Sequence, residues 1–178
     1  MKNFKRVAAA LLISAMVLGF AGCGVKEVEA KDFRDVVKDV LDCDKEDLDS
    51  ADGKDLDIDY IEERIRYRGE DSDKYTVVYY EYEDEEAAKY FFDQEITTYK
   101  FYKSHDGIEG KIKFSSKYMT VDASYEPYYD AKSEDIYGGI YLAGPYVIKI
   151  YCYSGKDKNK DTVDELLKEL GLPRPSRA

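Results

Sequence analysis

The chain has 178 residues, a length that suits one domain with its own hydrophobic core. It carries 38 acidic and 27 basic residues, for a formal net charge of −11. Such an acidic surface disfavours nucleic acid and anionic lipid headgroups as partners and favours cations or a basic partner. The 18 Tyr and 7 Phe residues supply more apolar area than a disordered chain usually has, so we expect a folded domain.

Residues 1–22 have the layout of an export signal. A basic start, from Met1 to Arg6, leads into an uncharged apolar stretch from Val7 to Ala21. That stretch is shorter than the roughly 20 residues that cross a bilayer as a helix, so a permanent transmembrane segment is the weaker alternative. We therefore expect residues 1–22 to be removed on export.

The end of the signal, Phe20-Ala21-Gly22-Cys23, resembles the lipobox of bacterial lipoproteins. The sequence departs from that family at Phe20, where Leu or another aliphatic residue is usual. The resemblance implies that Cys23 receives a diacylglyceryl group with fatty acyl chains such as palmitate. It would then be the new N-terminus and anchor the protein on the extracytoplasmic face of the cell membrane. Residues 23–30 are the lipidated cysteine and a short tether of about 25 Å, which keeps the domain of residues 31–178 close to the membrane.

The first predicted element of the domain is a helix from about Lys31 to Asp42. Its apolar residues recur with helical spacing in a single stripe of Phe33, Val36, Val37, Val40 and Leu41. The acid-rich stretch from Asp44 to Asp59 is predicted to be a loop with one short turn. The pattern from Tyr60 to Tyr67 fits either a strand or a helix.

A strand and a helix are predicted next. The β-branched and aromatic residues from Tyr75 to Tyr82 are typical of a strand. Asp84 is predicted to cap the following helix, which has Glu85 and Glu86 in its first turn and ends near Tyr102.

Two hairpins are then expected, one formed by residues 111–114 and 118–123 and one by residues 136–142 and 146–153. Gly138-Gly139 lies within a strand pattern, which indicates a bulge or a close backbone approach. A final helix is predicted to begin at Asp161 or Thr162 and to end at Gly171.

The strands 75–82 and 146–153 are similar in sequence and each precedes an acid-capped helix, which suggests two related strand-helix units. We therefore expect an α+β fold, a mainly antiparallel sheet with about three helices packed on one face. With its Tyr-Val-Ile strand and Leu-rich last helix, the mature chain resembles small lipoproteins of unknown function from Gram-positive gut bacteria. That resemblance implies no activity.

Cys43 and Cys152 remain after the lipidated cysteine. Outside the cytoplasm the two thiols can oxidise, and a bridge across so long a loop would stabilise the fold by roughly 4 kcal/mol. Cys152 shares one face of its strand with Ile148 and Ile150 and is predicted to point into the core. The alternative to a disulfide is two buried thiols that pack as small apolar groups.

No stretch of the sequence has the spacing of a known metal site. With Gly53 at the sixth position of a calcium loop, Leu48 would occupy the first, and the run from Asp157 to Asp161 is followed by Thr162 instead of Gly. The single histidine, His105, is flanked by Ser104 and Asp106 but is expected to form a polar turn. We assign no catalytic residue, metal or cofactor.

The function expected from these observations is a membrane-anchored, non-enzymatic module at the cell surface that binds a small ligand or another envelope protein. One alternative is an extracytoplasmic hydrolase that acts on cell-wall polymers through Asp/Glu pairs. A buried carboxylate pair in a cleft, with a raised pKa, would favour this alternative. A calcium-responsive surface protein is the other alternative.

Overall fold

The computed structural model describes residues 25–56, 60–105, 108–125 and 134–177. The predicted signal and the lipidation at Cys23 lie outside these residues and stay predictions.

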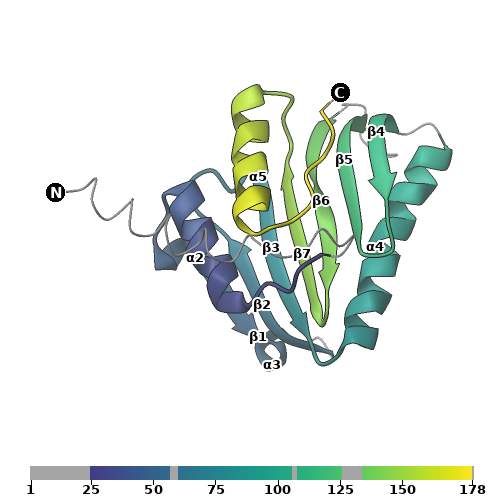
Figure 1. Cartoon of the computed structure of the whole chain (residues 1–178). Helices are drawn as coiled ribbons and strands as arrows, with labels where there is room; N and C mark the ends of the chain where they lie inside the picture. Colours follow the sequence, from purple (N-terminus) through teal and green to yellow (C-terminus); the bar gives the residue numbers. More distant parts are fainter. Residues whose placement is uncertain (1–24, 57–59, 106–107, 126–133, 178) are drawn as a thin grey trace.

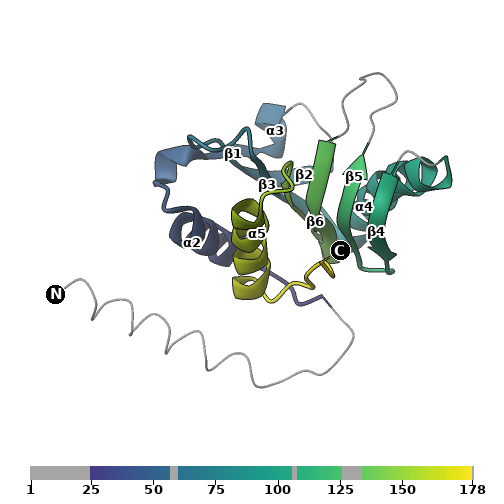
Figure 2. The same ribbon diagram turned by 90° about the horizontal axis from the view of Figure 1, so that it is seen from above.

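The described residues form an α+β fold built on one seven-stranded antiparallel sheet, with strand order β1-β2-β3-β7-β6-β5-β4 (Figures 1 and 2). The helices are α2 (Ala30–Leu41), the short α3 (Gly53–Leu56), α4 (Glu85–Ser104) and α5 (Asp157–Glu169). The strands are β1 (Leu48–Asp52), β2 (Ile61–Tyr67), β3 (Tyr75–Tyr82), β4 (Ile108–Phe114), β5 (Tyr118–Tyr125), β6 (Glu134–Ala143) and β7 (Tyr146–Cys152).

Both faces of the sheet are buried, and each face has its own core. On β3, Tyr79 faces α2 and α5, whereas Tyr82 faces α4, because successive side chains point to opposite sides. The first core joins Phe33, Val37, Tyr79, Tyr137, Tyr141, Ile148, Ile150, Leu166 and Leu167. The second joins Ala88, Phe92, Ile96, Met119, Val121, Ile140 and Val147. Two apolar faces explain the large number of Tyr and Phe residues and the use of helices on both sides.

The expected strand-helix units exist, but the expectation that all helices pack on one face is wrong. The strands β3 and β7 are antiparallel neighbours, with Tyr79 opposite Ile148. After β3 the chain crosses to one face to form α4, and after β7 it crosses to the other face to form α5. The reason is that a sheet with two apolar faces needs a helical cover on each.

The acid-rich stretch from Asp44 to Asp59 is not simply a loop. Part of it is β1, an edge strand that pairs with β2, and this pairing also shows that the ambiguous stretch before Tyr67 is a strand. Leu48 is buried, and Asp49 forms an ion pair with Arg64 of β2. A partner strand therefore overrides the low strand propensity of an acidic segment. Residues 57–59 lie outside the described part.

The helix after β3 begins as predicted, since the Asp84 carboxylate accepts a hydrogen bond from the Ala87 backbone N at 2.8 Å. The last helix begins at Asp157, about one turn earlier than predicted. Thr162 does not cap it but donates its hydroxyl to the Lys158 carbonyl inside the helix. The earlier turn is held by a tertiary contact, because Asn159 is buried and accepts a hydrogen bond from the Tyr75 hydroxyl at 3.2 Å.

Both predicted hairpins are present. At Gly138 the close backbone approach is confirmed, because a Cβ there would collide with the Ile150 carbonyl oxygen and φ is +146°. The pairing of β6 with β7 continues through this point in regular register.

None of the helices in the described part of the chain is both long enough and apolar enough to span a membrane.

Candidate functional site

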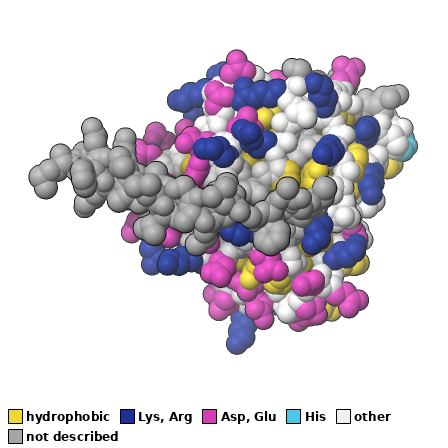
Figure 3. Space-filling view, viewed as in Figure 1, with side chains coloured by type: hydrophobic (Ala, Val, Ile, Leu, Met, Phe, Trp, Pro, Cys, Tyr) yellow, Lys and Arg dark blue, Asp and Glu magenta, His cyan; other side chains and the backbone are white. Residues whose placement is uncertain are grey.

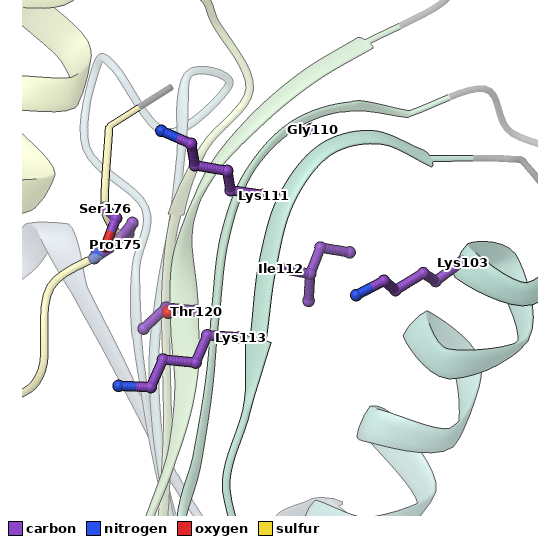
Figure 4. Close-up of a pocket in the computed structure, with 8 residues that line it drawn as sticks. All are labelled: Lys103, Gly110, Lys111, Ile112, Lys113, Thr120, Pro175 and Ser176. Carbon is purple, nitrogen blue, oxygen red and sulfur yellow. The ribbon is translucent and has the colours of Figure 1, made fainter.

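A hollow of about 260 Å³ lies at β4, the edge strand nearest to α4 (Figure 4). Its lining consists of Lys103, Gly110, Lys111, Ile112, Lys113, Thr120, Pro175 and Ser176. Three of these residues are lysines and two carry hydroxyl groups, and the lining contains no carboxylate. This composition contrasts with a chain whose net charge is −11.

The alternation of side chains along β4 determines on which side of the sheet its lysines lie. Ile108, Ile112 and Phe114 face α4 and pack against the second core. Lys111 and Lys113 therefore project from the opposite side, toward the segment that follows α5, as Figure 4 shows. An apolar row on one side of the strand thus leaves Glu109, Lys111 and Lys113 on the other.

Lys103 comes from the last turn of α4 and lies on the α4 side of β4 (Figure 4). Its ammonium is 5.6 Å from the centre of the Phe114 ring, and that of Lys113 is 5.3 Å from the Tyr118 ring. Aromatic rings thus contact two of the three cations. In Figure 3, Lys and Arg side chains are spread over the top, centre and right of this face, whereas acidic side chains are most frequent at the bottom.

The segment from Leu172 to Arg177, which we call the strap, forms one wall of the hollow through Pro175 and Ser176. The Lys111 ammonium donates a hydrogen bond of 2.6 Å to the Arg177 carbonyl. The Arg177 guanidinium is 2.9 Å from Asp164 and also pairs with Asp161, both on α5.

A buried ion pair lies behind the hollow. Asp122 of β5, whose side chain is 5% exposed, is 2.6 Å from Lys160 of α5. The ring of Tyr137 lies beneath the Lys160 ammonium at 5.1 Å, and its hydroxyl donates to Asp164 at 2.6 Å. Burial raises the pKa of Tyr137 well above its ordinary value, so the phenol stays a neutral donor. Asp122 and Asp164 are therefore engaged with groups of the protein itself.

This arrangement can bind an anion. Lysine ammonium groups are compact charges that bind phosphate, sulfate or carboxylate oxygens, and hydroxyl groups can donate to the same oxygens. A carboxylate in the lining would compete with such a ligand, and the lining has none.

The two remaining cysteines are free thiols in the structure, Cys43 half-buried and Cys152 buried as expected. The Cys43 thiol contacts the Val37 carbonyl, and that of Cys152 contacts the Ser154 carbonyl. Burial raises the pKa of Cys152 to about 11. The structure does not join the two sulfurs, and the disulfide stays a prediction.

One pair of carboxylates, Glu63 and Glu81, is relevant to the hydrolase alternative. Glu63 and Glu81 are directly opposite each other on β2 and β3, and burial together with Glu62 and Glu63 raises the pKa of Glu81. Glu63, however, pairs with Arg34 of α2, and the hollow lies at the far edge of the sheet. Glu81 thus has a raised pKa, but no cleft is described beside it.

Other residues considered in the sequence fall into structural positions. His105 follows α4, and its Nδ1 lies 2.9 Å from both the Ser104 hydroxyl and the Phe101 carbonyl at the exposed helix end. Asp106 is outside the described residues. The run from Asp157 to Asp161 is the start of α5, and no cluster of three metal-ligating side chains occurs in the part of the chain that the structure describes.

Sequence reasoning missed the hollow. A signal was present, because Lys100, Lys103, Lys111, Lys113 and Lys117 form a basic stretch within an acidic chain. The alternation of lysines and apolar residues from Lys111 to Phe114 also indicated which side the lysines would share.

The comparisons with known proteins give no match: no family model, no curated protein and no solved structure resembles this chain significantly.

Proposed function

We propose that this protein is a lipid-anchored, non-enzymatic binding module on the extracytoplasmic face of the cell membrane, and that it binds an anionic group in the hollow at β4. The observation that carries the proposal is the lining, in which Lys111 and Lys113 lie with two hydroxyl groups on one side of β4 and which contains no carboxylate. The ligand is a small molecule or an envelope protein that presents phosphate, sulfate or carboxylate.

The charge of the whole chain makes this local composition informative. A surface with 38 acidic and 27 basic residues repels anions at long range, so an anion gains affinity only where cations are close together. The expectation that the acidic surface favours a basic partner concerns the rest of the molecule. It stays a prediction and does not extend to the hollow.

A binding titration with a matched control tests the proposal. The full chain is purified in detergent, and inorganic phosphate and sulfate are titrated by calorimetry at an ionic strength of about 0.1 M, where the Debye length is about 10 Å. We expect the double variant Lys111→Gln/Lys113→Gln to lose at least about tenfold in affinity, because two charge-assisted contacts disappear.

The control is Lys45→Gln/Lys54→Gln, which removes the same charge from two exposed lysines on either side of β1. We expect its affinity to change by less than about twofold, because charges beyond the Debye length are screened. No measurable binding by the parent protein, or equal losses in both double variants, would refute the proposed site.

The anchor has a separate test. The parent protein should fractionate with the membrane, and Cys23→Ser should not be lipidated and should leave the membrane fraction. If Cys23→Ser were processed and retained as the parent is, the lipid anchor would have to be abandoned.

A further inference from the structure

The strap is held firmly at its beginning and weakly at its end. Leu172 and Pro175 are buried, and the Tyr141 hydroxyl donates to the Pro173 carbonyl at 2.7 Å. Beyond Pro175, Ser176 is exposed, and the Arg177 side chain is 43% exposed. Figure 1 shows the strap returning from α5 along the sheet.

The end of the strap is held by groups that water can reach. Arg177 pairs with Asp164 and with Asp161, whose side chain is 65% exposed, and its guanidinium lies 5.9 Å from the Tyr137 ring. The Asp164 side chain is 19% exposed and that of Arg177 is 43% exposed, so this pair is partly open to water. Ion pairs that water reaches contribute little to stability, and this end can detach while the buried part of the strap stays in place.

The closed strap engages a cation of the hollow. The Arg177 carbonyl accepts a proton of the Lys111 ammonium at 2.6 Å, and Ser176 occupies the adjoining wall. An anion that is to be held fully by Lys111 must replace this carbonyl. Opening of the strap would release the lysine and widen the hollow at the same time.

We propose that the strap is an intramolecular competitor of the ligand, with Arg177 as the latch that keeps it closed. This inference rests on the proposed function, because it describes the regulation of the same hollow. The closed strap lowers the apparent affinity for an anion by the fraction of molecules in which it is open. A partner that pulls Arg177 away from Asp161 and Asp164 would activate the site.

The test uses the direction in which one substitution changes the affinity for phosphate. Arg177→Ala removes a positive charge near the hollow, and by charge alone it should weaken anion binding. If the strap competes with the ligand, the same substitution frees Lys111 and should tighten phosphate binding about three- to tenfold. Arg177→Lys keeps the charge but loses the planar fork that contacts two carboxylates, so it should give a smaller gain.

The strap inference and the proposed function can fail separately. Unchanged or weaker phosphate binding by Arg177→Ala would overturn the strap, provided that Lys111→Gln/Lys113→Gln still loses affinity. Absence of phosphate binding by the parent, or the same loss in Lys45→Gln/Lys54→Gln, would overturn the hollow itself and the strap with it. Thermal unfolding of each variant verifies that the fold is retained.

Discussion

The charged side chains of the two edge strands, β1 and β4, have different surroundings. On β1, Asp49 lies 2.8 Å from Arg64 of the neighbouring strand and 4.0 Å from Arg68. On β4, Lys111 and Lys113 face hydroxyl groups and a backbone carbonyl around a hollow without carboxylates. Charged side chains on an edge strand commonly serve to prevent edge-to-edge pairing. The comparison shows that β1 needs no more than this explanation, whereas β4 keeps a cationic surface that can bind a ligand.

The two edges also differ in the burial of the charges near them. The Asp122 and Lys160 side chains next to β4 are 5% and 17% exposed. The Asp49 and Arg64 side chains at β1 are 40% and 21% exposed. A buried pair costs much more to break than an exposed one, so equivalent substitutions on the two sides should have unequal effects.

The largest expected effect is that of Asp122→Ala, which leaves the Lys160 ammonium buried without its carboxylate. We expect the free energy of unfolding to fall by about 3–5 kcal/mol, as measured by urea denaturation. Asp49→Ala, which breaks the half-exposed pair at β1, should cost less than about 1 kcal/mol. Equal costs for the two substitutions would contradict the difference in burial.

A smaller effect should appear at alkaline pH, and it tests the first core, to which Cys152 of β7 and Leu48 of β1 belong. Burial raises the pKa of Cys152 from the ordinary 9.0 to about 11. Between these values the unfolded chain releases the thiol proton and the folded chain keeps it, so stability falls as pH rises. The loss should reach about 2 kcal/mol at pH 11, and buried tyrosines with raised pKa values add to it.

Urea denaturation between pH 7 and 11 measures this dependence. Cys152→Ala should lower the stability at pH 7 but give a flatter decline above pH 9, because one titrating group is removed. A decline as steep as that of the parent would show that the Cys152 thiol does not titrate as described.

The smallest expected effect is that of Arg64→Met at β1. The Arg64 Nε is buried without a hydrogen-bond partner, and its guanidinium gains only a half-exposed ion pair, so the loss of stability should stay below about 1 kcal/mol. Phosphate affinity should not change. A large loss of phosphate affinity would mean that the basic residues of β2, and not those of β4, hold the anion.

Local patterns in the sequence predicted those elements whose causes are local. The stripe that includes Phe33 and Val37 gave the first long helix, and Asp84 gave the start of α4. The start of α5 could not be predicted in this way, because its first turn is held by a bond between Asn159 and Tyr75, which is distant in sequence. The strand β1 was missed for the same reason, since Asp49 is stabilised by arginines of the following strand.

The hollow, too, depends on contacts between residues that are distant in sequence, and it could not be predicted from local patterns. Its walls come from α4, β4, β5 and the strap, and only the folded chain brings Lys111, Lys113 and Ser176 to the same side of β4. The lysines were visible in the sequence, but a lining without a carboxylate was not.

The most direct test of the central claim is to locate bound phosphate by the backbone amide NMR signals of the full chain in detergent micelles. The account predicts saturable shifts at Gly110, Lys111, Lys113 and Ser176, with signals of β1 unchanged. Shifts centred on β1 and β2, or shifts that do not saturate, would contradict a specific anion site at β4.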